Sequence, residues 1–313
     1  SLAAGQSKHL AGLPAGAACT VTETDAAGAA STTTGITQAG SPVADADPAA
    51  RAAGFTLVPG ESATGVEFRN AYTTGSVTIA KVLDGSGASR WADPQFTVRL
   101  VCTLADATGT TVFDGSHTIS VAEPWTVDGL PTGASCAVTE TASGAANARA
   151  ITNGSFTVGT GAASVTVRNT YTLGTVRVTK HLQLNGAATS AAPWTDGSYT
   201  VRLACTRPVN GVDTPIDIPG GATRRITGAG TADFADLPTG ATCAVSEVAS
   251  SPASQRTTVS PATVVVGTDP ASPQAVTVTN DFHTATMGVR KQLSGAGSAA
   301  FGSGPFDFEV SCT

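Results

Sequence analysis

The sequence predicts an all-β protein made of tandem antiparallel β-sandwiches, and three observations lead to this prediction. Charged residues make up only 13% of the chain, while glycine occurs 35 times. Short runs that alternate apolar and polar residues follow one another, separated by turn-forming residues such as proline and glycine. The same runs then return in a fixed order along the 313 residues. Alternation with a period of two favours strands over helices, and regular turn signals favour sandwiches.

Four signatures make up the repeat. The first ends in lysine, the second runs from an aromatic residue to cysteine, the third runs from a Leu-Pro turn through cysteine to glutamate, and the fourth ends in Asn-x-aromatic. Copies of the first signature lie at 77–81, 176–180 and 288–291, and copies of the second at 96–102, 199–205 and 306–312. Copies of the third lie at 13–23, 130–140 and 237–247, and copies of the fourth at 66–72, 165–171 and 276–282. A unit of about 100 residues with such turn signals is typical of an Ig-like sandwich.

The order of the signatures predicts four segments. Complete sets occur in residues 74–172 and 173–283, which we predict to be two whole sandwich repeats. Residues 1–73 contain only the third and fourth signatures, so we expect the C-terminal part of a repeat there. Residues 284–313 contain only the first two, so we expect the N-terminal strands of another repeat. The chain is therefore expected to be a section of a longer array.

Composition and motif content argue against several functions. A net charge of −6 without a basic stripe argues against nucleic acid as a partner. No apolar run is long enough to cross a bilayer, so we expect no transmembrane segment in this stretch. The four histidines stand at unrelated positions, and no paired carboxylates, Ser-His-Asp set or phosphate loop recurs. We therefore expect no enzyme, no metal site and no cofactor.

Four of the six cysteines predict two disulfides. Cys102 and Cys136 lie on the second and third signatures of one repeat, and Cys205 and Cys243 take the same positions in the next. Each pair is therefore expected to form a bond within its own repeat. A zinc site is disfavoured, because each strand carries a single cysteine and no CxxC motif occurs.

The two remaining cysteines, Cys19 and Cys312, belong to the incomplete sets. We expect each to pair with a cysteine outside this stretch. The alternative is a head-to-tail disulfide between Cys312 of one chain and Cys19 of another. Disulfides of this kind indicate an oxidising, extracytoplasmic setting.

Strand parity predicts that three polar residues of each complete repeat point towards the apolar face. Side chains two positions apart on a strand share a face, so a terminal polar residue lies on the side of the apolar residues that alternate before it. The three are Lys81, Glu140 and Asn169 in one repeat, and Lys180, Glu247 and Asn280 in the next. Isolated buried charges are very costly, so these groups should meet one another.

Lysine is rare in this chain, and its positions support a chemical role. Only four lysines occur against thirteen arginines, and three of the four occupy the repeated position. A buried lysine can lose its proton and become a nucleophile, whereas an arginine keeps its charge. The alternative is purely structural: a lysine whose ammonium reaches water from a strand end, a glutamate that caps a turn and an asparagine that starts one.

The repeated VTxxK, CxVxE and VxVxNxY motifs resemble the Cna B-type (prealbumin-like) repeats of Gram-positive and actinobacterial surface adhesins and pilins, in a cysteine-containing variant. The resemblance covers nearly the whole chain. In that family the first-strand lysine is joined covalently to the last-strand asparagine, with an acidic residue between them. The resemblance implies the fold of those repeats, tandem Cna B-type sandwiches.

The resemblance also implies residue roles. The isopeptide pairs would be Lys81–Asn169, assisted by Glu140, and Lys180–Asn280, assisted by Glu247. Asn70 with Glu23, and Lys291, would be halves of incomplete sites. The amine would attack the asparagine amide carbon, the glutamate would assist proton transfer, and ammonia would leave. Such a reaction occurs once per repeat, so it is self-crosslinking without turnover.

A structural function follows from the resemblance. We expect a stalk or fibre segment on a bacterial cell surface, extracellular and anchored through parts outside this stretch. Its partners would be neighbouring repeats of the same chain and other copies in a fibre. The alternative is an adhesin module that binds a glycan or a host protein through the loops 103–129 and 206–236, where the complete repeats differ most, with Trp125 as its exposed aromatic.

Two further tryptophans occupy equivalent positions. Trp91 and Trp194 each stand five residues before the aromatic residue that opens the second signature. A regular position predicts a plug at one end of the sandwich rather than a platform for a sugar.

Overall fold

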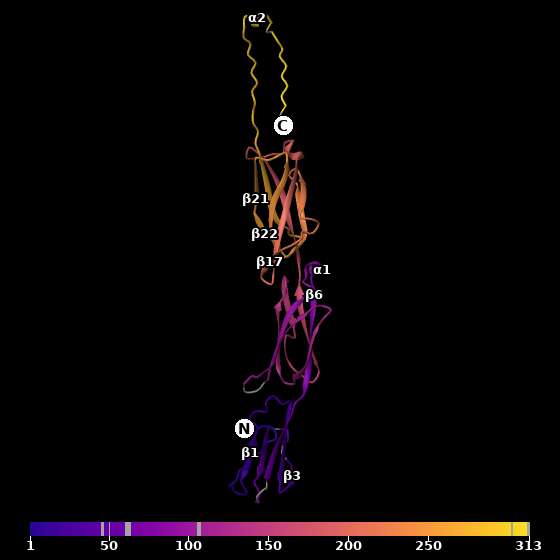
Figure 1. Cartoon of the computed structure of the whole chain (residues 1–313), viewed down its shortest axis with the longest axis vertical. Coiled ribbons are helices and arrows are strands. Elements are labelled where there is room, and N and C mark those ends of the chain that lie inside the picture. The colour runs from indigo at the N-terminus through magenta and orange to yellow at the C-terminus, as the bar shows by residue number, and fades with distance from the viewer. Residues whose placement is uncertain (45–46, 50, 60–63, 105–107, 302, 312–313) are drawn as a thin grey trace.

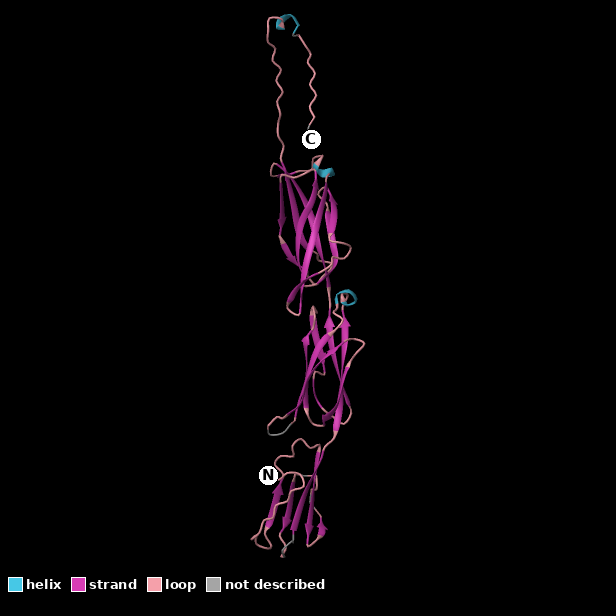
Figure 2. Cartoon of the chain, in the orientation of Figure 1, coloured by secondary structure: helices cyan, strands magenta, loops and turns pink. Residues whose placement is uncertain are grey.

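The structure is a computed structural model, and it describes residues 1–44, 47–49, 51–59, 64–104, 108–301 and 303–311. The chain forms a rod in which three β-structured regions follow one another along the long axis (Figure 1). Strands account for almost all of the regular structure, as Figure 2 shows. The predicted all-β class with sandwich units is therefore confirmed.

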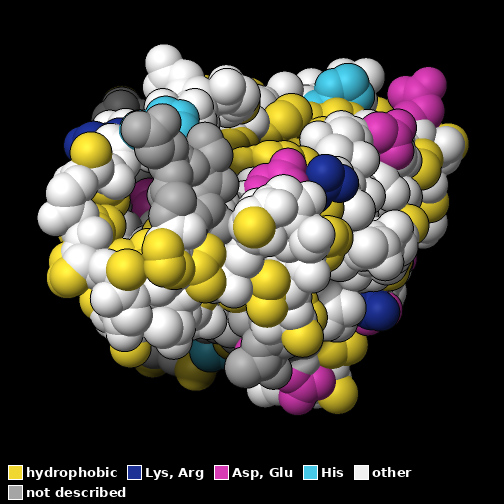
Figure 3. Space-filling view, turned by 90° about the horizontal axis from the view of Figure 1, so that it is seen from below, with side chains coloured by type: hydrophobic (Ala, Val, Ile, Leu, Met, Phe, Trp, Pro, Cys, Tyr) yellow, Lys and Arg dark blue, Asp and Glu magenta, His cyan; other side chains and the backbone are white. Residues whose placement is uncertain are grey.

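The N-terminal region holds two small sheets. One pairs β1 with β4 and the other has the order β3-β2-β5. The strands are β1 (Ala18–Thr22), β2 (Ser31–Gln38), β3 (Ser41–Val43), β4 (Ala52–Thr56) and β5 (Thr64–Ala71). Every described side chain of β1 and β3 is at least partly exposed. In the end-on view of this region, charged side chains are few and dispersed among uncharged surface (Figure 3).

The second region, here called the middle sandwich, packs two four-stranded sheets face to face. Their orders are β12-β10-β7-β8 and β11-β13-β6-β9. The elements are β6 (Thr74–Asp84), α1 (Ala88–Trp91), β7 (Phe96–Thr103), β8 (Thr111–Ile119), β9 (Trp125–Pro131), β10 (Ser135–Ala142), β11 (Ala148–Thr152), β12 (Ser155–Thr157) and β13 (Ala162–Thr170). Alternate residues of β6, β7 and β13 are buried between the sheets, which is the pattern that period-two alternation produces.

The third region, here called the C-terminal sandwich, repeats this plan. Its sheets have the orders β15-β14-β23-β21, with β19 also on β14, and β17-β16-β20-β22, with β18 also on β16. The elements are β14 (Leu173–Leu184), β15 (Ala187–Ala188), η1 (Trp194–Asp196), β16 (Ser198–Val209), β17 (Val212–Pro215), β18 (Thr223–Thr227), β19 (Thr231–Pro238), β20 (Thr242–Ser251), β21 (Arg256–Ser260), β22 (Thr263–Val265) and β23 (Gln274–Phe282).

One strand pair in each sandwich departs from the expected antiparallel pattern. The first and last strands, β6 with β13 and β14 with β23, lie side by side and run parallel. The chain enters a sandwich at one end of the rod axis and leaves at the other (Figure 1), so its first and last strands must point the same way. The sheets are otherwise antiparallel.

Both predicted disulfides are present. Cys102 is bonded to Cys136, and Cys205 to Cys243. Each bond joins residues directly opposite one another on neighbouring strands, and all four cysteines are buried in the sandwich cores. Cys19, on β1, is free and half-buried.

Residues 284–301 and 303–311 lie beyond the C-terminal sandwich as an extended loop with the short helix α2 (Ser298–Phe301) at its tip (Figure 1). Within the described part of this segment, residues 288–291 and 306–311 form no strand, so the strands expected there are not seen in this structure. A strand is stable only beside partners that satisfy its backbone groups, and none of the described strands pairs with this loop. Cys312 lies outside the described residues.

Candidate functional site

The middle sandwich brings its three predicted polar residues together between the sheets. Lys81 comes from β6, Glu140 from β10 and Asn169 from β13. The Nζ of Lys81 donates to Oε1 of Glu140 at 2.7 Å, and Nδ2 of Asn169 donates to the same oxygen at 3.0 Å. The amide nitrogen of Asn169 also donates to the backbone carbonyl of Ser143 at 3.2 Å. One carboxylate oxygen thus holds the lysine and the asparagine against each other.

The C-terminal sandwich contains the same cluster. The Nζ of Lys180, from β14, donates to Oε2 of Glu247, from β20, at 2.6 Å. The Nδ2 of Asn280, from β23, donates to Oε1 of that carboxylate at 2.7 Å. Here each carboxylate oxygen takes one partner, so the glutamate bridges the lysine and the asparagine.

Burial of these clusters is nearly complete. The side chains of Lys81 and Lys180 are 0% exposed, and those of Glu140 and Glu247 are 3% and 4% exposed. Ion pairs removed from water in this way gain little net stability, because desolvation offsets much of the attraction. Stability alone therefore does not explain why both sandwiches bury a lysine, a glutamate and an asparagine together.

An aromatic ring covers each lysine. The Nζ of Lys81 lies 4.1 Å from the ring centroid of Phe96, and that of Lys180 lies 4.7 Å from the centroid of Tyr199. Burial lowers the pKa of both lysines, while the hydrogen bond and charge of the neighbouring glutamate oppose the fall. Burial therefore makes the neutral amine, which is the nucleophilic form, more accessible than it is for a lysine in water.

Three buried polar atoms of the middle cluster have no hydrogen-bond partner within the described residues. They are Oε2 of Glu140, Oδ1 of Asn169 and the hydroxyl of Tyr171. Burial raises the pKa of Tyr171 to about 12, and the nearby Asn169 side chain opposes that rise. Unsatisfied buried polar groups are costly and call for an explanation.

The expected half-sites have different surroundings. Glu23 and Asn70 meet in the N-terminal region, where Nδ2 of Asn70 donates to Oε1 of Glu23 at 2.7 Å. Both are half-buried, and no described lysine bonds to either. Lys291 is exposed in the C-terminal loop, with its Nζ 4.8 Å from the ring centroid of Phe306.

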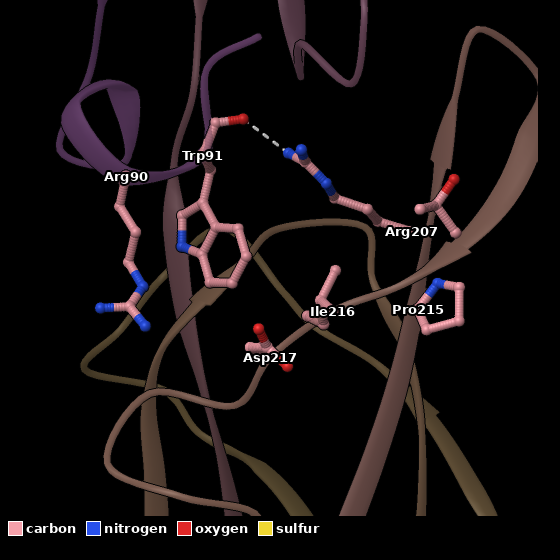
Figure 4. Close-up of a pocket in the computed structure, with 7 residues that line it drawn as sticks. Arg90, Trp91, Arg207, Pro215, Ile216 and Asp217 are labelled. Carbon is pink, nitrogen blue, oxygen red and sulfur yellow. Dashed lines mark hydrogen bonds between the residues drawn. The ribbon is translucent and has the colours of Figure 1, made fainter.

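Trp91 closes one end of the middle sandwich, and it does so against the next sandwich. Its indole Nε1 donates to the backbone carbonyl of Asp236 at 3.0 Å. Its own carbonyl accepts a hydrogen bond of 2.6 Å from Arg207, whose guanidinium lies 5.5 Å from the indole centroid. Figure 4 shows this contact beside a shallow pocket of about 350 Å³, also lined by Arg90 and Asp217. Residue spacing predicted a plug but could not reveal that the plug joins two sandwiches.

Trp194 and Trp125 make their contacts within a single sandwich. The ring of Trp194 lies 5.8 Å from that of Phe282 at the far end of the C-terminal sandwich, and the carbonyl of Trp194 accepts from the Tyr199 hydroxyl. Trp125 is half-buried on β9 and stacks on His117, with the ring centroids 5.3 Å apart. Much of the expected binding loops 103–129 and 206–236 is strand, in β8, β17, β18 and β19.

Sequence reasoning missed a threonine that faces the asparagine. Thr257 lies directly opposite Asn280, and Thr32 directly opposite Asn70, on neighbouring antiparallel strands. Each hydroxyl donates to the asparagine carbonyl oxygen, at 3.0 Å and 2.7 Å respectively. Threonine is so common in this chain that its repeated position carries no distinctive signal.

Within the described residues, no group of three or more histidine, cysteine, aspartate or glutamate side chains is arranged to hold a metal ion. The helices of that same part of the chain are all too short or too polar to cross a bilayer.

The fold and the clusters define a class of protein: tandem β-sandwich modules, each with a cross-strand disulfide and a buried lysine, glutamate and asparagine. The chain belongs to the family described as a domain of unknown function, DUF5979, whose sequence profile matches residues 1–73, 77–172 and 176–283. No curated protein sequence matches this chain significantly.

The chain is similar to several solved structures at low identity. A single B repeat unit of the collagen-binding surface protein Cna of Staphylococcus aureus is 15% identical, with 67% of this chain and 100% of that one covered and a TM-score of 0.22. A structure of two B repeat units of the same protein is also 15% identical, with 86% of this chain and 76% of that one covered and a TM-score of 0.22. The major pilin of Streptococcus pyogenes is 12% identical, with 67% of this chain and 99% of that one covered and a TM-score of 0.35.

Proposed function

We propose that this chain is a structural segment of an extracellular stalk or fibre, in which every sandwich is locked by an amide bond between its lysine and its asparagine. The buried cluster carries the proposal. In both sandwiches, the lysine of the first strand and the asparagine of the last hydrogen-bond to one glutamate that has almost no access to water. The repeat units are residues 74–172 and 173–283, and residues 1–73 and 284–313 belong to neighbouring repeats.

Proton transfer from lysine to glutamate is the first step. Burial lowers the pKa of Lys81, and Glu140 lies 2.7 Å from its Nζ, ready to accept the proton. A protonated carboxyl has an O–H to donate, and Oδ1 of Asn169 is a buried acceptor that lacks a donor. Moving one proton within the cluster therefore gives the amine its nucleophilic form and creates a donor for the asparagine carbonyl.

Bond formation follows from proximity. The Nζ of lysine attacks Cγ of asparagine, a C–N bond forms, and the bond between Cγ and Nδ2 breaks. The nitrogen that leaves takes up a proton passed on by the glutamate and departs as ammonia, so lysine and asparagine end as one secondary amide. Holding both groups on a single carboxylate supplies the effective concentration that an unactivated amide requires. Each sandwich reacts once.

The position of the bond suits a mechanical function. Tension along the rod enters a sandwich through its first strand and leaves through its last, and these strands are neighbours in one sheet. An amide between them carries the force directly across the pair. The other strands, and the disulfide between β7 and β10, are then not loaded.

Contacts between the sandwiches support a rod that resists bending. Besides the Trp91–Arg207 contact, the backbone of Gly144 exchanges two hydrogen bonds with Asn210, at 2.9 Å through its N–H and 3.2 Å through its carbonyl. Asn147 donates to the carbonyl of Thr239 at 2.8 Å. Together these contacts hold the two sandwiches at several points, which restricts bending at their junction.

Disulfides support an extracytoplasmic location. Two buried cystines in one short chain form and persist in oxidising compartments. A stalk or fibre on the outside of a cell works in such a setting.

The intact mass of the reduced and unfolded protein tests the proposal. The expected deficit is two ammonia molecules relative to the sequence, one for each complete sandwich. Lys81→Met and Lys180→Met should each abolish one deficit and leave the other. Lys8→Met changes an exposed lysine outside both clusters and should leave both deficits intact. A wild-type mass equal to that of the sequence would refute the proposed bonds.

A further inference from the structure

The asparagine carbonyl has a hydroxyl donor in two of the three regions. Oγ1 of Thr257 donates to Oδ1 of Asn280 at 3.0 Å, and Ser254 lies 2.9 Å from the same hydroxyl, so it can donate to Thr257 in turn. In the N-terminal region Oγ1 of Thr32 lies 2.7 Å from Oδ1 of Asn70 and 3.2 Å from Oε2 of Glu23. The shorter contact is again the one to the asparagine carbonyl.

The middle sandwich lacks this donor. Arg149 occupies the position opposite Asn169 that Thr257 occupies opposite Asn280. Arg149 is exposed, and Oδ1 of Asn169 has no hydrogen-bond partner among the described residues although the residue is 0% exposed. The two clusters are therefore alike in lysine, glutamate and asparagine but differ in what faces the carbonyl oxygen.

That oxygen is where charge develops during amide formation. When an amine adds to Cγ, the electron pair of the C=O bond moves onto Oδ1, and it returns when the nitrogen leaves. A hydroxyl donor placed there binds the charged state more tightly than the neutral amide, and such donors accelerate acyl transfer. At Asn169 no hydroxyl makes this hydrogen bond: the buried Tyr171 hydroxyl lies near the Asn169 side chain, but it too has no hydrogen-bond partner among the described residues.

We infer that Thr257 is a catalytic residue for the Lys180–Asn280 bond, because its hydroxyl stabilises the oxyanion on Asn280. Arg149 in the equivalent place makes Lys81–Asn169 the slower of the two bonds. This inference rests on the proposed function, since it concerns the rate of the bond proposed there.

A time course on newly made protein tests the inference. Full chains are labelled in a short pulse of cell-free synthesis under oxidising conditions, at mildly acidic pH where protonation of the lysine slows the reaction. Samples are quenched in denaturant at increasing times, reduced and digested, and the crosslinked fraction at each site is measured by mass spectrometry. Wild-type chains should crosslink faster at Lys180–Asn280 than at Lys81–Asn169.

Three variants identify the donor. Thr257→Val should slow the Lys180–Asn280 bond by about tenfold or more, because the loss of one oxyanion donor costs 10²–10³ in enclosed sites and less at a solvent edge such as this. Thr257→Ser keeps the hydroxyl and should stay near the wild-type rate. Arg149→Thr should speed the Lys81–Asn169 bond. Both positions are exposed, so the substitutions disturb no core packing.

The outcomes separate the two proposals. Equal rates in wild type and Thr257→Val, with crosslinking present in both, would overturn the role of Thr257 and leave the bonds standing. No crosslink at either wild-type site would refute the proposed function itself. The rate of folding, followed by tryptophan fluorescence in the same chains, should be unchanged by Thr257→Val, which distinguishes slow chemistry from slow folding.

Discussion

Lys81 and Asn169 meet across a parallel strand pair with a fixed offset. Lys81 stands opposite Val167, and Asn169 opposite Leu83, so the two residues are displaced by two positions in the register of β6 and β13. A displacement of two keeps both side chains on the buried face, where both bond to Glu140. Lys180 and Asn280 have the same offset. A slip of one position would turn one of the two to the opposite face.

Replacing the glutamate should stop the chemistry and preserve the shape of the cluster. Glu247→Gln retains the size of the side chain but removes the group that accepts the lysine proton, so the Lys180–Asn280 bond should not form. Peptide mapping should then show both residues unmodified, with the Lys81–Asn169 bond intact. Glu67→Gln, in an exposed pair with Arg69, is the control and should leave both bonds in place. Crosslinking at Lys180 in Glu247→Gln would contradict the role assigned to this carboxylate.

Without the bond, the buried lysine should make stability depend on pH. In Asn169→Ala, Lys81 remains an amine whose pKa is lowered by burial in the folded state from 10.5 in the unfolded chain. Between those two pKa values the unfolded chain binds more protons, so the free energy of unfolding should rise with pH. Below the lowered pKa, Lys81 is protonated in both the folded and the unfolded chain, so it no longer makes the free energy of unfolding depend on pH.

Urea denaturation of Asn169→Ala at a series of pH values between about 7 and 10 measures this slope. The double variant Lys81→Met, Asn169→Ala lacks the titrating amine, so its free energy of unfolding should rise less with pH. An identical pH profile in the two chains would show that burial does not perturb Lys81.

The disulfide should stabilise the middle sandwich independently of the amide. Replacing Cys102 and Cys136 with alanine opens a crosslink between residues 34 apart in sequence. The chain-entropy relation then predicts a loss of about 4 kcal/mol in the free energy of unfolding. Calorimetry should show one transition shifted to lower temperature and the transition of the C-terminal sandwich unchanged. Cys19→Ala removes a free cysteine and should shift neither.

We expect Arg207 to limit bending at the junction between the middle and C-terminal sandwiches. Leu104 holds the equivalent place, two residues after the cysteine, in the middle sandwich, so Arg207→Leu copies a residue that this position tolerates. The substitution removes the 2.6 Å bond to the carbonyl of Trp91. Small-angle scattering should report a smaller radius of gyration and a broader distribution of distances, as expected for a rod that bends.

The control for the junction is Arg202→Leu, an exposed residue on the same strand, β16. Its scattering should match that of the wild type. Each sandwich should keep its own unfolding free energy within about 0.5 kcal/mol in both variants, since neither substitution enters a core. Unchanged scattering in Arg207→Leu would mean that other contacts alone fix the junction.

Several features of the site could be predicted from sequence because they depend on local alternation. The position of Lys81 after Val77 and Ile79 identifies the buried face of its strand, and the same argument places Asn169. The pairing of Cys102 with Cys136 followed from their recurrence in each repeat. By contrast, the residues around Lys291 alternate in the same way but form no strand in this structure. An alternating sequence becomes a strand only when a neighbouring strand can hydrogen-bond to its backbone.

The sequence by itself determined the class of fold, the repeat, the disulfide pairs and which polar side chains are turned inward, since each follows from a period of two or from recurrence. Only the tertiary structure decided that the first and last strands run parallel, that Thr257 faces the carbonyl of Asn280, and that Trp91 packs against the next sandwich. These relationships join residues that are far apart in the chain. They arise from the direction of the chain along the rod and from strand register, which no local pattern of residues specifies.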